Sequence, residues 1–173
     1  MMYQIKAIDE FNLSAFTSDV FQIKDTSTPD AIIVRSSNVS DQLITPRLLL
    51  VARAGIGTNT INIEACTQNG TAVFNTPGAN ANAVKELVLQ ALFNSTRPLQ
   101  SAIAHTATLT GDDLQTQAEA TRYQFIGGEL YGKTIGIIGL GTIGQQLADS
   151  CYHLGMQVVG YNRSSKGLQS VQQ

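Results

Sequence analysis

The stretch TIGIIGLGTIGQQLADSCYHLGMQVVGY, residues 134–161, decides the fold of the second half of the chain. An apolar run ends at Gly139, and Gly141 and Gly144 follow at the spacing G-x-G-x-x-G. In a strand–turn–helix unit, such glycines allow a sharp turn, a close approach of backbone to a pyrophosphate, and tight packing of helix on strand. The stretch therefore predicts a turn whose N–H groups and helix dipole face an anion.

The residues after this turn continue the pattern of a βαβ unit. Gly155 is placed to end a helix whose apolar face is formed by Ile143, Leu147, Cys151 and Leu154. A second apolar strand over residues 157–161 completes the length that a dinucleotide fingerprint requires. We therefore expect a dinucleotide site, and the alternative is a glycine-rich turn that binds no ligand.

The residues that follow the second strand bear on which dinucleotide binds. An Asp or Glu there normally accepts a hydrogen bond from the ribose 2′-OH of NAD. This chain instead has Asn162, followed by Arg163 and two serines. An amide does not repel a 2′-phosphate, and a neighbouring guanidinium can bind one. NAD and NADP both remain open, and the alternative for Arg163 is a solvated loop charge.

Composition narrows the classes of partner. The 173 residues carry a net charge of −2, and only 14% are charged. No basic run indicates a nucleic-acid or membrane-surface partner, and no apolar stretch approaches the roughly 20 residues of a membrane span. Without a signal-peptide pattern, the chain is predicted to be cytoplasmic.

Cys66 and Cys151 are predicted to be buried free thiols, and no metal-ligand spacing includes His105 or His153.

The first half alternates short apolar strands with short helices and turns. We expect strands over residues 3–8, 20–24, 31–34, 48–51 and 71–74, and a helix over 61–69 that Gly70 ends. Ser40 is placed to cap a short helix that ends near Thr45 and Pro46. Continuous apolar runs favour a parallel sheet covered on both faces. The pattern predicts a small α/β domain.

The sequence NTPG, residues 75–78, interrupts this alternation. We place the domain boundary there, giving domains 1–77 and 78–173. A longer helix is expected from Asn80, and its apolar face should pack on the second domain through Val84, Leu87, Val88, Ala91 and Leu92. Residues 101–122 have few bulky apolar side chains and are predicted to form helix and loop on the surface.

Several motifs in this order resemble the D-isomer-specific 2-hydroxyacid dehydrogenases: VRSS (34–37), ARAGIG (52–57), NTPGAN (75–80), VKEL (84–87), GGELYGKTIGIIGLGTIG (127–144) and LGMQVVGYN (154–162). The most similar members act on 3-phosphoglycerate in serine biosynthesis. The resemblance implies an α/β fold with a flavodoxin-like substrate domain, followed by a Rossmann-type cofactor domain that is incomplete at its C-terminal end. It also implies NAD or NADP as cofactor, a small-molecule 2-hydroxy acid as substrate and a homo-oligomer.

The resemblance assigns binding residues by position. The cofactor would be held by Gly139, Gly141, Thr142, Ile143 and Gly144, with Asn162 and Arg163 at the ribose. The substrate's carboxylate or phosphate would face Arg35, Ser36 and Arg53 and the backbone of Ala54, Gly55 and Ile56. Arginines on strand-end loops suit an anion because each offers a bidentate fork, although a surface ion pair is the alternative. Asn59 and Asn62 stand where the family commonly has acidic residues.

No catalytic residue is assigned. Family members use an Arg, a Glu and a His, and the resemblance places all three beyond Gln173. The alternative function is a non-catalytic fragment that binds nucleotide or pairs with an intact dehydrogenase subunit, while a formate or glycerate dehydrogenase is less favoured. With one βαβ unit in the cofactor domain, we expect the isolated chain to be weakly stable, aggregation-prone or dimeric through an exposed strand edge.

Overall fold

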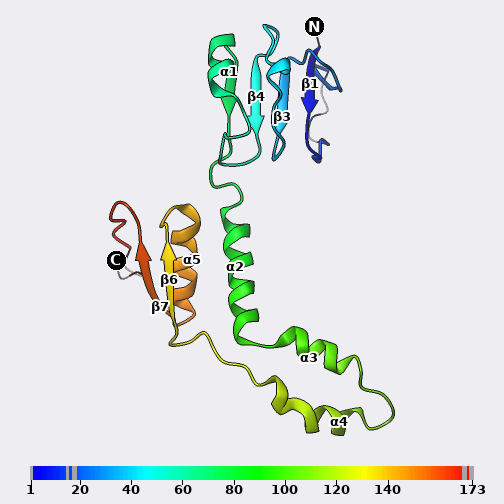
Figure 1. Cartoon of the computed structure of the whole chain (residues 1–173), viewed down its shortest axis with the longest axis vertical. Helices are drawn as coiled ribbons and strands as arrows, with labels where there is room; N and C mark the ends of the chain where they lie inside the picture. The colour runs from blue at the N-terminus through cyan, green and yellow to red at the C-terminus, as the bar shows by residue number, and fades with distance from the viewer. Residues whose placement is uncertain (1, 15, 17–18, 169–170, 172–173) are drawn as a thin grey trace. The chain divides into compact units, whose positions relative to one another are not determined.

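The computed structural model describes residues 2–14, 16, 19–168 and 171. The chain divides into two compact units, Met1–Asn80 and Ala81–Gln173, each with its own parallel sheet (Figure 1). The boundary proposed from the sequence, between residues 77 and 78, lies three residues before this division.

The first unit contains a five-stranded parallel sheet in the order β2-β1-β3-β4-β5. This is the flavodoxin-like strand order that the family resemblance implied. Its strands are β1 (Tyr3–Ala7), β2 (Phe21–Ile23), β3 (Ala31–Val34), β4 (Leu50–Arg53) and β5 (Ala72–Phe74). The prediction that β4 begins at residue 48 was wrong, because Leu48 closes a turn by donating its N–H to the carbonyl of Thr45 at 2.8 Å.

Helix α1 (Ile63–Asn69) covers one face of this sheet, and Cys66 of α1 is buried beside Val51 of β4 in the core cluster. The Asn62 side chain caps α1 by accepting the N–H of Ala65 at 3.0 Å, so the helix begins two residues later than predicted. Gly70 ends α1 in the left-handed conformation, with φ +76°. The short 3₁₀ helix η1 (Asp41–Leu43) begins at the predicted cap, Ser40.

The expectation that helices cover both faces of this sheet was wrong for the described part of the first unit. Among the described residues of the first unit, α1 and η1 are the helices, and both contribute to the core cluster formed by Ile32, Val34 and Val51. An apolar pocket of about 220 Å³ is lined by residues of three neighbouring strands and by Phe16: Ile5 of β1, Ala31, Ile32 and Ile33 of β3, and Leu50 and Ala52 of β4. Continuous apolar strands therefore did not ensure a helix on each face.

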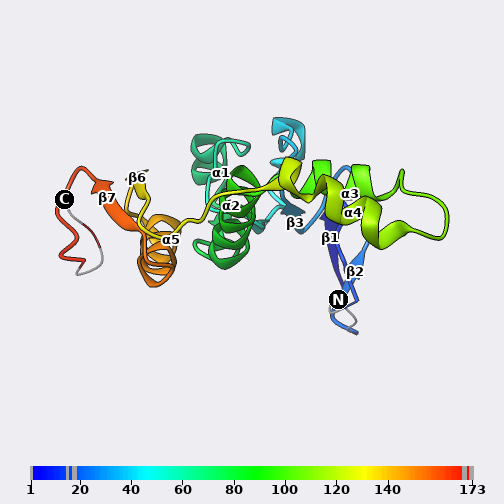
Figure 2. The same cartoon turned by 90° about the horizontal axis from the view of Figure 1, so that it is seen from below.

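The second unit is built on a two-stranded parallel sheet of β6 (Thr134–Ile138) and β7 (Gln157–Tyr161), joined by helix α5 (Thr142–His153). Helix α2 (Ala81–Thr96) lies beside α5 in both views (Figures 1 and 2). As predicted, α2 packs on this unit, with Val88, Leu89 and Leu92 against the core of Leu147, Ala148 and Cys151. The predicted face was partly wrong, because Leu87 is 64% exposed and Ala91 is exposed, while Leu89 packs in their place.

The remaining helices of the second unit are α3 (Leu99–Thr106), α4 (Leu114–Thr121) and the 3₁₀ helix η2 (Arg122–Phe125). None of them contains a buried residue, which agrees with the predicted surface segment. The sheet itself is open, because Ile138 is 89% exposed and Tyr161 is 70% exposed. Across the described part of the chain, no helix combines the length and apolar character needed to cross a membrane.

Candidate dinucleotide and anion sites

The glycine-rich turn joins the end of β6 to the start of α5. Gly139 has φ +95°, a conformation that side-chain-bearing residues rarely adopt, and its N–H donates to the carbonyl of Tyr161 at 2.8 Å. A Cβ on Gly144 would lie only 2.1 Å from the carbonyl oxygen of Gly139, whereas one on Gly141 would meet nothing within 4 Å. As predicted, Gly139 makes the sharp turn, Gly141 leaves the approach to the backbone open, and Gly144 allows the helix to pack closely on the strand.

The first turn of α5 offers donors to an anion. Gln145 is the residue whose N–H reaches back to the carbonyl of Gly141, at 2.9 Å. The N–H groups of Thr142, Ile143 and Gly144 precede it in the first turn, where a helix lacks internal acceptors. No side chain caps this end of α5. The positive end of the helix dipole and the open approach at Gly141 suit the binding of an anion such as a pyrophosphate.

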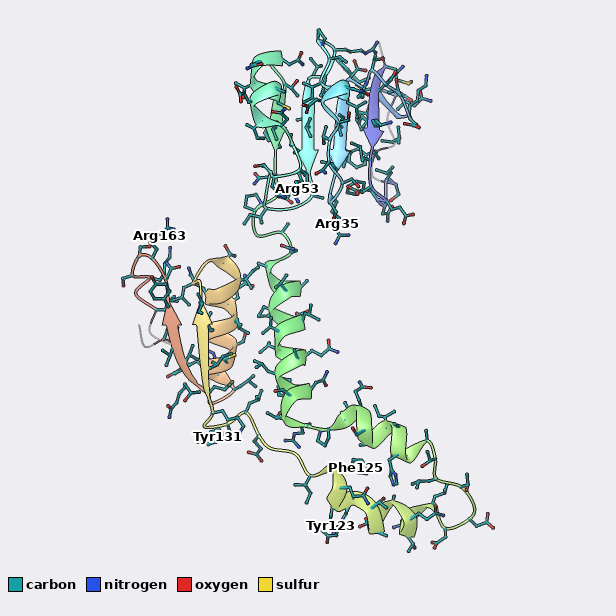
Figure 3. All side chains as sticks on the ribbon, viewed as in Figure 1. Arg35, Arg53, Tyr123, Phe125, Tyr131 and Arg163 are labelled. Carbon is teal, nitrogen blue, oxygen red and sulfur yellow. The ribbon has the colours of Figure 1, made fainter. Side chains whose placement is uncertain are left out.

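Asn162 connects the turn to the loop after β7. Its Oδ1 accepts the N–H of Leu140 at 3.1 Å, and its Nδ2 donates to the carbonyl of Ser164 at 2.8 Å. Both ends of the amide are therefore used within the protein, and a ribose contact would have to share or replace one of these bonds. Arg163 is exposed at the carboxyl end of β7, the same end of the sheet as the turn (Figure 3).

Arg35 and Arg53 lie at the carboxyl ends of β3 and β4 (Figure 3). The Nε of Arg53 donates to the carbonyl of Arg35 at 3.0 Å, and its Nη1 donates to Oδ1 of Asn59 at 3.1 Å. Gly57 leaves room for this guanidinium, since a Cβ there would lie 2.8 Å from Nη1. Arg53 thus braces the loops with part of its donor set, and the amide of Asn59 supplies the acceptor.

A pocket of about 230 Å³ lies at this edge of the first unit, lined by Arg35, Ala54, Gly55, Thr76, Ala79 and Asn80. Of the residues assigned to the substrate, it brings together Arg35, Ala54 and Gly55. Ser36, Arg53 and Ile56 are not part of its lining, and Ile56 is 68% exposed.

The pocket also contains residues that the site assignment missed. Thr76, Ala79 and Asn80 belong to the motif NTPGAN, and the N–H of Thr76 donates to the carbonyl of Gly55 at 3.0 Å. The N–H of Ala54 is bonded to the carbonyl of Val34 at 2.8 Å, so it is not free for a ligand. Among the residues that line the pocket, Arg35 is the one with a charged side chain.

The sequence also did not identify Asp9, which follows β1. Its carboxylate accepts the backbone N–H groups of Arg35, Ser36 and Ser37 and the hydroxyl of Ser37, the last at 2.7 Å. The Ser37 hydroxyl and the Arg35 N–H are the main causes that lower the pKa of Asp9 from 3.8 to about 2. An Asp directly after an apolar strand was the available signal.

Neither histidine lies in a metal-binding cluster. His105 Nε2 is 2.9 Å from Oγ1 of Thr121, and its ring lies 5.2 Å from that of Phe125. His153 ends α5, at the far side of a 12-residue helix from the glycine-rich turn. Among the residues that the structure describes, no group of three or more His, Cys, Asp or Glu side chains could hold a metal ion.

Two family models match the sequence. The first, D-isomer specific 2-hydroxyacid dehydrogenase, catalytic domain, matches residues 4–143. The second, NAD binding domain of 6-phosphogluconate dehydrogenase, matches residues 134–173, which include the glycine-rich turn, α5 and β7.

Comparisons with individual proteins also find dehydrogenases. D-3-phosphoglycerate dehydrogenase of Methanocaldococcus jannaschii is 38% identical over 144 residues, which are 82% of this chain and 25% of that protein. A protein of Polaromonas described as a D-isomer specific 2-hydroxyacid dehydrogenase superposes with TM-score 0.79 at 19% identity, over 98% of this chain and 58% of that one. NAD⁺-bound 3-phosphoglycerate dehydrogenase of Entamoeba histolytica superposes with TM-score 0.65 at 24% identity, over 99% of this chain and 57% of that one. The chain thus spans about a quarter of the length of its curated relatives.

Proposed function

The chain belongs to the family of D-isomer specific 2-hydroxyacid dehydrogenases, and on that premise we propose that it carries the cofactor turn and the substrate anion pocket of an oxidoreductase. That enzyme transfers hydride between NAD or NADP and a 2-hydroxy acid. The observation that carries the proposal is the fit of Gly144 under the carbonyl of Gly139, which leaves the first turn of α5 open to a pyrophosphate.

The substrate that we propose is 3-phosphoglycerate. Several curated relatives bear the name D-3-phosphoglycerate dehydrogenase. Arg35 stands at a pocket whose size suits a small carboxylate or phosphate, and a guanidinium binds either group through paired hydrogen bonds. Arg53, Ser36 and the backbone of Ala54, Gly55 and Ile56 would shape the loops around that anion.

For the cofactor, Thr142, Ile143 and Gly144 would offer their N–H groups to the pyrophosphate, with Gly139 and Gly141 forming the turn. A bound nicotinamide would supply the hydride acceptor or donor. Asn162 is neutral and Arg163 follows it, so a 2′-phosphate meets no carboxylate at this position. NAD and NADP are therefore both proposed, and direct binding of each decides between them.

A second candidate is a non-catalytic module that binds a dinucleotide or pairs with an intact dehydrogenase subunit. Two observations favour it. His105 Nε2 lies at Thr121 Oγ1, His153 is the last residue of α5, and by resemblance neither occupies the family's catalytic position. The exposed Ile138 and Tyr161 also leave an apolar sheet surface that a second subunit would cover. We propose a homo-oligomer on this ground, and a cytoplasmic location suits the two free thiols.

Equilibrium binding of NADH and NADPH tests the cofactor site. Gly141→Ala should leave the fold intact, because its Cβ would meet nothing within 4 Å, yet weaken binding on the order of tenfold or more by obstructing the pyrophosphate. Gly136→Ala in β6 is the matched control, since its Cβ also meets open space and it lies before the turn. If neither dinucleotide binds, the cofactor site is refuted.

Turnover of 3-phosphoglycerate separates the two candidates. We expect the purified 173-residue chain to bind a dinucleotide without oxidising the substrate. Measured turnover that Arg35→Leu abolishes would instead assign the full reaction to this chain. Binding without turnover favours the non-catalytic module for the chain by itself.

A further inference from the structure

The carboxylate of Asp9 lies where the sheet connections diverge. In the strand order β2-β1-β3-β4-β5, the chain leaves β1 toward one side of the sheet and β3 toward the other. Ligands of open parallel sheets bind outside the carboxyl ends of the strands at such a switch point. Asp9 follows β1 and Arg35 follows β3, so both stand at this place, 26 residues apart in sequence.

The backbone of Arg35 is held from both sides. Its N–H donates to Oδ2 of Asp9, and its carbonyl accepts the Nε of Arg53 at 3.0 Å. The next two residues add the N–H of Ser36 at 3.0 Å and the hydroxyl of Ser37 at 2.7 Å, both to Asp9. The carboxylate therefore fixes the turn that carries the Arg35 side chain.

We propose that Asp9 is a positioning residue for anion binding, because it holds the turn of Arg35, Ser36 and Ser37 so that the Arg35 side chain stands at the pocket. This proposal rests on the proposed function, in which Arg35 binds the carboxylate or phosphate of the substrate. It adds a residue that itself touches no ligand.

The sign of the electrostatic effect makes the proposal testable. A negative charge next to an anion pocket repels the ligand, so removing that charge without moving Arg35 should tighten anion binding. Removing the bonds that hold the turn should weaken it. In Asp9→Asn the amide retains one acceptor oxygen but turns an NH₂ group toward backbone N–H donors, so the turn loses part of its support. The two effects have opposite signs, and the proposal predicts that positioning prevails.

The experiment measures 3-phosphoglycerate binding to the full 173-residue chain by amide and guanidinium NMR shifts. We expect Asp9→Asn to weaken binding roughly five- to twentyfold and to move the amide signals of Arg35, Ser36 and Ser37. Asp25→Asn is the charge control. It removes the same charge after β2, at the same edge of the sheet, where Asp25 pairs with Lys6. It should leave affinity unchanged or slightly higher.

A second control separates positioning from a loss of stability. Arg47→Leu removes the partner of Asp30, which precedes β3 at the opposite edge of the sheet, and should destabilise the same unit. Affinity measured where all variants remain folded should be unchanged in Arg47→Leu. If Asp9→Asn binds as tightly as the unmodified chain, or more tightly, the positioning role is refuted.

Arg35→Leu tells this failure apart from failure of the proposed function. If Arg35→Leu abolishes binding while Asp9→Asn does not alter it, the anion pocket is supported and the positioning role of Asp9 is refuted. If Arg35→Leu binds like the unmodified chain, or if the unmodified chain does not bind 3-phosphoglycerate, both the anion pocket and the positioning role of Asp9 are refuted.

Discussion

Replacing Gly144 by alanine is the most direct test of how the glycine-rich turn is built. The new Cβ would stand 2.1 Å from the carbonyl oxygen of Gly139, about 1.3 Å inside the 3.4 Å at which ordinary contact begins. Because that oxygen belongs to the backbone, no side-chain rotation relieves the clash. The start of α5 must move away from the end of β6, or the turn must deform.

The size of the effect follows from two opposing terms. Overpacking of a closely fitted site costs up to about 3 kcal/mol. Alanine in place of glycine inside a helix returns about 1 kcal/mol. The net loss is therefore about 2 kcal/mol, which lowers the melting temperature of a unit of this size by roughly 10 °C. Dinucleotide binding should be lost as well, since the N–H groups of the first turn move with the helix.

Urea unfolding followed by circular dichroism gives the free energy, and hydrogen exchange over residues 134–153 assigns the loss to this unit. Gly136→Ala is the matched control, because its Cβ has open space and alanine suits a strand better than glycine. It should be as stable as the unmodified chain or slightly more stable. If Gly144→Ala and Gly136→Ala have the same free energy of unfolding, the close packing of α5 on the turn is not the reason for the glycine at position 144.

Three further outcomes follow from named contacts. Arg47→Leu should destabilise the first unit by about 2 kcal/mol at neutral pH, because Asp30, 7% exposed, would keep only the N–H of Gln4 as a strong donor. A loss below about 0.5 kcal/mol in urea unfolding would contradict this estimate. The folded-state pKa of Asp9 is depressed from 3.8 to about 2, so its stabilisation is present above pH 3.8 and disappears as the pH falls toward 2. Acid titration of the Ser36 and Ser37 amide signals should show this loss, and Asp9→Asn should remove it. Burial raises the thiol pKa of Cys66 and Cys151, so both should react slowly with a disulfide reagent at pH 8 and rapidly in urea, whereas a fast-reacting thiol in the native chain would refute their burial.

The open surfaces of the two sheets bear on how the chain functions. The apolar face that includes Leu50 and Ala52 has no helix from the described part of its own unit, and Ile138 of β6 is almost fully exposed. The expectation that the isolated chain is weakly stable, aggregation-prone or dimeric through the exposed edge of the second unit stays a prediction. Size measurements at several protein concentrations test that expectation directly, and a sharp two-state melt of a monomer would contradict it.

The sequence by itself determined the local units. The βαβ stretch around Gly139, the cap of η1 at Ser40 and the glycine that ends α1 depend on periodicity and backbone conformation within about thirty residues. The strand boundaries were less certain, as β4 shows, because a turn closed by Leu48 took two residues from the apolar run. The family resemblance then supplied the assignment of Arg35 to the substrate and of individual residues of the turn to the cofactor.

Only the tertiary structure decided which of these residues meet. Asp9 reaches the N–H groups of residues 35–37 because β1 and β3 are neighbours in the sheet, and no local pattern encodes that pairing. Arg53 donates to the carbonyl of Arg35, and Asn162 accepts from Leu140, for the same reason. Hydrogen-bond donors and acceptors are satisfied by whatever group the fold brings within about 3 Å, so the sequence names the groups and the strand order selects the partners.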